Sequence, residues 1–162
     1  MTGTDAPFLR TLCSLRWLAV AGQAATILVA TWVLGLALPQ LPLWAGVAAL
    51  TLFNLYAQLR VHDADTAPLT AFCHILVDVT VLTWMVGWSG GIANPFGSLF
   101  LILIALAALA LPLRWTLAVA AACLIGYAAS GVFGLPLPSG YFTGAQMQQW
   151  GVVCNFLLSA TV

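Results

Sequence analysis

Charge is what this sequence has least of. Only 5% of its 162 residues are charged, 63% are hydrophobic, and the formal net charge is zero. A soluble domain carries roughly 25% charged residues, so this chain cannot build an ordinary water-facing surface. A neutral chain also lacks the basic patch that nucleic-acid binding requires. The shortage of charge therefore excludes a soluble domain and argues against a nucleic-acid partner.

Clusters of metal-binding side chains are also missing. The cysteines stand singly along the chain, and no two of them form a Cys-X-X-Cys pair. A zinc site needs several thiolates or imidazoles close together, so the sequence predicts no metal site. We interpret these residues as small apolar members of helices, namely Cys13, Cys73, Cys123 and Cys154.

Long apolar runs make up most of the chain. Most are about 17–22 residues long, which matches the ~30 Å hydrocarbon layer at ~1.5 Å per helical residue. The last run has about 13 residues and is too short to cross, so we expect a truncated sixth span that continues outside this chain. We predict an all-α, polytopic membrane protein with spans at Trp17–Leu36, Leu43–Leu59, Leu69–Trp88, Phe96–Leu111, Trp115–Phe133 and from Trp150 onward.

The arginines predict the orientation of the chain in the membrane. All the arginines lie on one side of the membrane, in the N-terminal segment or in the links after the second and fourth spans. The three links on the other side carry neither Lys nor Arg. Cytoplasmic links are the ones enriched in Lys and Arg, so the N-terminus is predicted to be cytoplasmic. This divides the chain into a cytoplasmic segment, 1–16, and a six-helix membrane domain, 17–162, with an outer loop at 89–95. The arginines are Arg10 and Arg16 before the first span, Arg60 after the second, and Arg114 after the fourth.

Asp78 is the outstanding polar residue inside an apolar run. An Asp near the bilayer centre costs roughly 2.5–3.5 kcal/mol, so its position needs a reason. His74 lies one turn earlier on the same helical face, where an imidazole and a carboxylate can hydrogen-bond or share a proton. Two interpretations stay open: a polar clasp between helices, or a proton-coupled relay. Amides in or near the spans are expected to bond across helices, namely Gln23, Asn54, Gln58 and Asn155.

The segment Trp88–Ser98, WSGGIANPFGS, interrupts the apolar runs without any charge. Two glycines provide the positive φ values common at helix ends, Asn94 fits an N-cap, and Pro95 fits the first helical position. A tight outer turn explains these residues completely. A binding site is the alternative, because free N–H groups at the helix start suit a carbonyl oxygen and nearby aromatic side chains could stack on a ring. The aromatic candidates are Trp84, Trp88 and Phe96.

The same segment resembles a family signature. "HILVD" in the third span followed by "GGIANPF" is similar to the membrane sensor region of RegB/PrrB-type redox-sensing histidine kinases, which carry a GGxxNPF heptapeptide in an outer loop. The N-terminal "LRWLAVAGQ" and the six expected spans add to the resemblance, which covers essentially the whole chain. The five fixed positions of the heptapeptide are matched by Gly90, Gly91, Asn94, Pro95 and Phe96.

The resemblance implies a sensor of the quinone pool in the bacterial inner membrane, with ubiquinone bound at the heptapeptide. It also implies a homodimer and a response regulator that receives phosphate. The full-length protein would be a histidine kinase, but the phosphotransfer and ATP-binding motifs do not occur in these residues, so this chain is expected to sense without catalysing. Two competing hypotheses stay open: a small proton-coupled transporter or channel that uses His74 and Asp78, and a purely structural membrane anchor or assembly partner in which the heptapeptide is only a turn.

Overall fold

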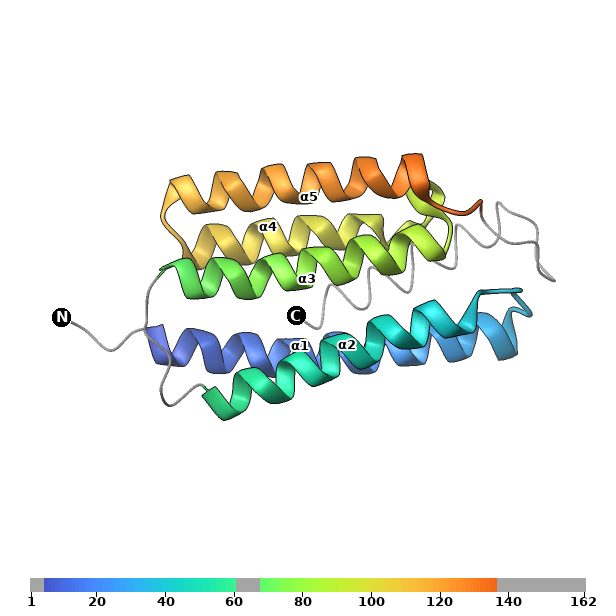
Figure 1. Cartoon of the computed structure of the whole chain (residues 1–162), viewed down its shortest axis with the longest axis horizontal. Helices are drawn as coiled ribbons and strands as arrows, with labels where there is room; N and C mark the ends of the chain where they lie inside the picture. The colour runs from blue at the N-terminus through green and yellow to red at the C-terminus, as the bar shows by residue number, and fades with distance from the viewer. Residues whose placement is uncertain (1–4, 61–67, 137–162) are drawn as a thin grey trace.

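The molecule is a bundle of helices that lie side by side along one long axis (Figure 1). The computed structural model describes residues 5–60 and 68–136, and all structural statements refer to these. The all-α expectation is confirmed, and the expected sixth span lies outside the described residues. Within them the α-helices are α1 (Asp5–Leu28), α2 (Gln40–Arg60), α3 (Pro68–Trp88), α4 (Leu99–Ala110) and α5 (Leu113–Phe133).

Most helix ends fall close to the sequence expectation, and α1 departs from it most. This helix begins at Asp5, well before the boundary expected at Trp17, and continues into a π-helical turn over Val29–Val33. Arg16 therefore lies within a helix instead of ahead of it. At the fourth span a short 3₁₀ turn, η3 (Pro95–Ser98), precedes α4.

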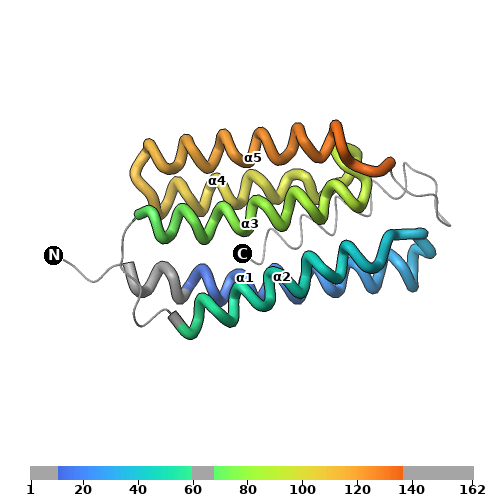
Figure 2. Tube along the Cα trace, in the orientation of Figure 1, coloured from blue at the N-terminus to red at the C-terminus, as the bar shows by residue number. Residues whose placement is uncertain are grey.

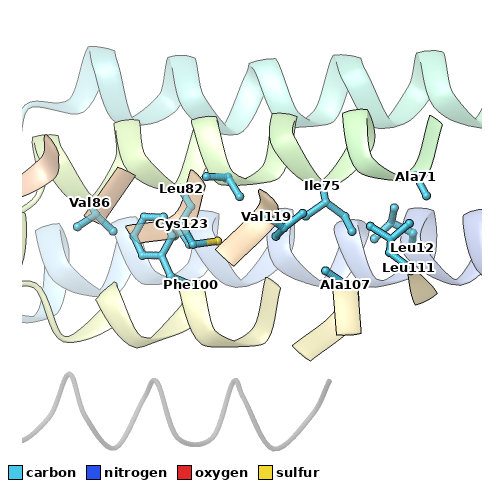
Figure 3. Packing of buried hydrophobic residues seen from close by; sticks show 11 residues of the cluster. Leu12, Ala71, Ile75, Leu82, Val86, Phe100, Ala107, Leu111, Val119 and Cys123 are labelled. Carbon is cyan, nitrogen blue, oxygen red and sulfur yellow. The ribbon is translucent and has the colours of Figure 1, made fainter. Parts of the chain in front are cut away.

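Two groups of helices make up the bundle. Helices α3, α4 and α5 form one group and α1 pairs with α2, while α3 packs against α2 and joins the groups (Figures 1 and 2). The main core lies between α3, α4 and α5, where Ile75, Ala107 and Val119 are 0% exposed (Figure 3). A second cluster joins α1 and α2 to α3 around Leu43, Val47 and Met85.

Several helices have the length and composition of membrane spans. Among the described residues three qualify, Thr11–Val33, Pro68–Trp88 and Leu113–Phe133, and Pro95–Ala110 is a shorter apolar helix. Large apolar side chains face outward, such as Leu109 at 86% exposure. A surface of this kind is suited to lipid contact.

The chain reversals alternate between the two ends of the bundle. The α1–α2 link, the α3–α4 turn and the end of α5 share one end, and the α4–α5 link lies at the other (Figure 1). This is the antiparallel arrangement that the span order requires. Arg60 and Arg114 lie at the end opposite to the α3–α4 turn. The cytoplasmic placement of that end stays a prediction from the positive-inside pattern, and we call it the inner end.

Candidate functional site

The turn between α3 and α4 uses two consecutive glycines with positive φ. Gly90 has φ 126° and Gly91 has φ 56°, values that side-chain-bearing residues rarely adopt. They end α3 and lead into a 3₁₀ turn, η2 (Gly91–Ala93). The expected role of the glycine pair in leaving the third span is confirmed.

Asn94 caps the start of the next helical segment. Its Oδ1 accepts from the backbone N–H of Phe96 at 2.8 Å, and Pro95 occupies the first turn, as the sequence predicts. Its amide nitrogen donates to the Ser89 hydroxyl at 2.6 Å and to the Ser89 carbonyl at 3.0 Å. One side chain therefore ties the end of α3 to the start of the fourth span.

The N–H groups after Pro95 are not free. This corrects the expectation that they could donate hydrogen bonds to a carbonyl oxygen of a bound ligand. The N–H of Phe96 donates to the Asn94 side chain, and that of Gly97 donates to the Asn94 carbonyl at 3.1 Å. Asn94 itself is buried and uses both hydrogens of its amide within the turn. The N–H groups of Phe96 and Gly97 and the Asn94 amide therefore donate within the turn.

The turn packs tightly on the outer end of α5. A Cβ added at Gly91 would lie 2.6 Å from the Ser130 carbonyl oxygen, and one at Gly97 would lie 2.7 Å from the Tyr127 ring. The end of α5 is also tied to α3, because the Leu135 N–H donates to the Gly87 carbonyl at 2.9 Å. The turn and the outer ends of α3 and α5 therefore form one packed unit.

A groove of about 310 Å³ lies between the outer ends of α3 and α5. Its lining is mostly apolar and carries no charge. Two of the predicted quinone-site residues, Trp84 and Trp88, line it, whereas the five heptapeptide positions are not among its lining residues. The lining consists of Thr83, Trp84, Gly87 and Trp88 from α3, Ala129, Ser130 and Phe133 from α5, and Gly134 and Leu135 after it.

Two of the lining residues, Thr83 and Ser130, carry hydroxyl groups. The Thr83 hydroxyl donates to the Val79 carbonyl at 2.8 Å, and the Ser130 hydroxyl donates to the Tyr127 carbonyl at 2.7 Å. Both oxygens keep lone pairs that can accept a hydrogen bond. The sequence did not single out Thr83 or show that Ser130 faces α3, since the groove brings together helices far apart in the chain.

The indoles form one wall of the groove. The rings of Trp84 and Trp88 are 5.6 Å apart and tilted. The Trp84 N–H donates to the Pro42 carbonyl at 2.8 Å, which ties α3 to the start of α2. Phe96, the third predicted aromatic, is half-buried in the turn.

Asp78 is paired with Arg16, a partner that the sequence did not indicate. The Arg16 Nε and Nη2 donate to the two carboxylate oxygens at 2.7 Å each, in a bidentate ion pair between α1 and α3. The side chains are 1% and 12% exposed, respectively. Asp78 thus contacts a neighbouring helix, as the clasp interpretation requires, and the charge on Arg16 is compensated inside the bundle.

The suggested hydrogen bond between His74 and Asp78 is replaced by this ion pair. His74 contributes its backbone carbonyl, which accepts from Arg16 Nη2 at 3.2 Å, while its Nδ1 is buried without a partner among the described residues. The His74 ring packs on Phe53, whose own ring lies 4.9 Å from the Arg16 guanidinium carbon. Asp78 has both oxygens engaged by a fixed cation.

Asn54 connects α2 to the same cluster. It is 0% exposed, its amide donates to the Cys13 carbonyl at 3.0 Å, and its Oδ1 lies 3.5 Å from Arg16 Nη1. This confirms the expectation that Asn54 bonds across helices. The signal that could have identified Arg16 is its opposite charge to Asp78, once the first span is allowed to begin before it. We call Arg16, Asn54 and Asp78 the polar cluster.

Comparisons with known proteins cover most of the chain. The family model for the PilS-like transmembrane domain matches residues 12–160. A sensor histidine kinase RegB from Cereibacter sphaeroides is 35% identical over 130 residues, 80% of this chain and 28% of that relative. A RegB from a named strain of that species is 49% identical over 49 residues, 30% of this chain and 11% of the relative. The chain thus spans less than a third of these relatives, and no solved structure matches it.

Proposed function

Because the chain belongs to the family of PilS-like transmembrane domains, we propose that it senses the redox state of the quinone pool by binding ubiquinone in the groove between α3 and α5. It is a RegB-type membrane sensor region and lies in the bacterial inner membrane as a multi-pass protein. The observation that carries the proposal is an uncharged, aromatic-walled groove beside the heptapeptide turn.

The size and lining of the groove suit a quinone ring. A cavity of about 150 Å³ holds a benzene ring, and this groove of about 310 Å³ leaves room for ring substituents. Trp84 and Trp88 provide aromatic surface for stacking. The bundle carries no charge there, so a lipid-soluble molecule could enter sideways from the bilayer.

The hydroxyl groups of the groove provide a basis for redox discrimination. A quinone presents two carbonyl acceptors, whereas a quinol presents two hydroxyl donors. The Thr83 and Ser130 oxygens are acceptors, because each hydroxyl hydrogen is already donated within its own helix. The quinol therefore gains hydrogen bonds that the quinone cannot make, and a difference of about 1.4 kcal/mol would give tenfold tighter binding of the reduced form.

The heptapeptide has a supporting role in this proposal. Gly91 allows the turn to approach Ser130, and Asn94 closes the turn on itself. The turn thereby fixes the outer end of α5 against α3, and with it the width of the groove. Turn residues would affect ligand affinity through the shape of the groove, without touching the ring.

The remaining functions concern the full-length protein and follow the RegB relatives. We propose that the sensor controls a histidine kinase core, the activity named in these relatives, and that this core passes phosphate to a response regulator. The homodimer that the heptapeptide resemblance implies is part of the same proposal. A ligand shifts helix packing only if it binds two conformations with different affinity. The transporter hypothesis has less support, because Asp78 is held by Arg16 through both oxygens instead of facing His74.

Binding of ubiquinone and ubiquinol to the chain in lipid nanodiscs tests the groove. Trp88→Leu should weaken both ligands by about 2–10-fold, since an aromatic contact contributes roughly 0.5–1.5 kcal/mol. Ser130→Ala should weaken only ubiquinol. The matched control is Trp32→Leu, because Trp32 is 81% exposed and does not line the groove. Equal affinities in all four proteins would sink the assignment.

A further inference from the structure

Gly87 on α3 lacks the packing reason that explains other glycines of the bundle. At six other positions an added Cβ would lie closer than 3.0 Å to a neighbouring atom, so the missing side chain allows close packing there. Around a Cβ added at Gly87, by contrast, nothing lies within 4 Å. The six closely packed positions are Gly46, Gly91, Gly97, Gly126, Gly131 and Gly134.

Backbone conformation does not require a glycine at this position either. Gly87 is the next-to-last residue of α3 and is not among the described residues with positive φ. The chain leaves α3 through the positive φ values of Gly90 and Gly91, which follow three and four residues later. Within a helix, glycine is less favourable than alanine, because it loses more backbone freedom on folding. Neither packing nor conformation therefore accounts for Gly87.

The open space at Gly87 belongs to the groove between α3 and α5. Gly87 lines this groove together with Thr83, Trp84 and Trp88 of the same helix. At about 100° per residue, a side chain at position 87 would point between the directions of the Thr83 and Trp84 side chains. Since both of these line the groove, an added side chain would enter it. The absence of a side chain at Gly87 thus contributes to the volume of the groove.

The backbone of Gly87 is held in place at the edge of the groove. Its carbonyl accepts the Leu135 N–H at 2.9 Å, which ties α3 to the segment after α5. A substitution at position 87 keeps this carbonyl, so the bond between the two walls should survive it. Gly87 therefore offers bare backbone at a fixed place beside the indoles of Trp84 and Trp88, where a flat ring can approach closely.

We propose that Gly87 is the specificity-determining position of the groove, because its missing side chain leaves the space that the flat ring of the ligand occupies. The ring lies on the Gly87 backbone, beside Trp84 and Trp88. This inference rests on the proposed function and assigns the part of the groove that holds the ring. The position acts through size, so it affects the oxidised and reduced forms alike. Ser130, which acts through a hydrogen bond, should instead distinguish them.

Graded substitutions at position 87 test the proposal in lipid nanodiscs. Gly87→Ala should weaken ubiquinone and ubiquinol alike by about fivefold, and Gly87→Leu by about 100-fold, because overfilling a packed site costs more as the side chain grows. The unfolding midpoint, measured on the same samples, should stay level or rise, because the new side chain displaces no protein atom. The matched control is Ala128→Leu, at an exposed position of α5 that does not line the groove, and it should bind like the parent.

The outcomes separate this inference from the proposed function. If the parent binds ubiquinone and Gly87→Leu binds it equally well, the inference is overturned and quinone binding stands; Gly87→Ala decides if the leucine variant does not fold. Loss of only one redox form also overturns the inference, because a steric effect acts on both.

Failure of the parent to bind either form overturns the proposed function. Naphthalene, a flat ring without a tail or an oxygen, then decides the inference on the same samples. Its binding is measured as the excess over protein-free nanodiscs. An excess in the parent that is lost in Gly87→Leu supports a space for a ring at Gly87. An equal excess in the two proteins, or none in either, overturns it.

Discussion

The outer turn and the polar cluster satisfy their polar groups in opposite ways. In the turn, Asn94 bonds to residues two and five positions away, so its donors and acceptor are matched locally. In the polar cluster, the partners of Arg16 are 38 to 62 positions away on two other helices. A local unit forms whenever its own backbone folds, whereas a long-range unit exists only if three helices are already in register. Substitutions in the two regions should therefore differ in how much stability they cost and in how many helices they affect.

Arg16→Leu should have the largest effect on stability. It leaves the Asp78 carboxylate buried without its cation, which costs about 3–5 kcal/mol when one partner of a buried pair is removed. Unfolding in mixed detergent micelles measures the loss.

The control for this substitution is Arg114→Leu. Arg114 is exposed at the start of α5 and stacks on Trp115, so its loss should cost about 1 kcal/mol or less. The double variant Arg16→Leu/Asp78→Leu should recover most of the stability, because no charge is left buried. A single variant as mild as Arg114→Leu would mean that Asp78 has another way to be satisfied.

The contrast also explains what could be predicted from the sequence. The turn was predictable because Gly, Asn and Pro each have a backbone preference that acts within a few residues. The spans were predictable because apolar runs of membrane length occur between short polar links. Asp78 was identified as exceptional, but His74, the ionisable residue one turn earlier on its helix, was not its partner. The partner depended on the relative register of α1 and α3.

The groove was beyond sequence reasoning for the same reason. It lies between α3 and α5, so Thr83 and Ser130 gain their importance only from helix packing. The start of α1 was misplaced because Arg16 was taken as a mark of the membrane boundary. A buried countercharge removes that inference, since the arginine can then lie within the span.

Gly91→Ala should have the next largest effect, and it shows how far the turn depends on α5. A left-handed φ of 56° is strained for alanine, and the new Cβ would lie 2.6 Å from the Ser130 carbonyl oxygen. Strain and overpacking together should cost about 3 kcal/mol in the free energy of unfolding. Gly87→Ala is the matched control, because nothing lies within 4 Å of its Cβ and it sits in a helix, where alanine is favoured by about 0.5–1 kcal/mol. Effects of the same sign in the two variants would contradict the packing argument.

Asn94→Ala should cost less, about 1–2 kcal/mol, because it removes an N-cap and the two bonds to Ser89. Asn94→Ser keeps a capping oxygen and should recover about half of this loss. The comparison variant is Thr80→Ala on α3, whose exposed hydroxyl donates to the Leu76 carbonyl of its own helix. Unfolding of the three variants under the same conditions separates capping from the loss of any polar group. If Asn94→Ala proves no worse than Thr80→Ala, the turn is held by packing alone.

Tyr127→Phe should have the smallest effect and decides how the turn is attached to α5. The Tyr127 hydroxyl lies 3.5 Å from the Ile92 carbonyl and is at a partly exposed position, so the bond should contribute about 0.5 kcal/mol or less. The ring itself meets Gly97 and lies edge-on to Phe100 at 6.0 Å. Tyr127→Ala removes that ring and should cost several times more than Tyr127→Phe. Unfolding measures both losses. A much larger loss in Tyr127→Ala would show that packing of the ring joins the turn to α5, whereas a large loss in Tyr127→Phe would assign that role to the hydrogen bond.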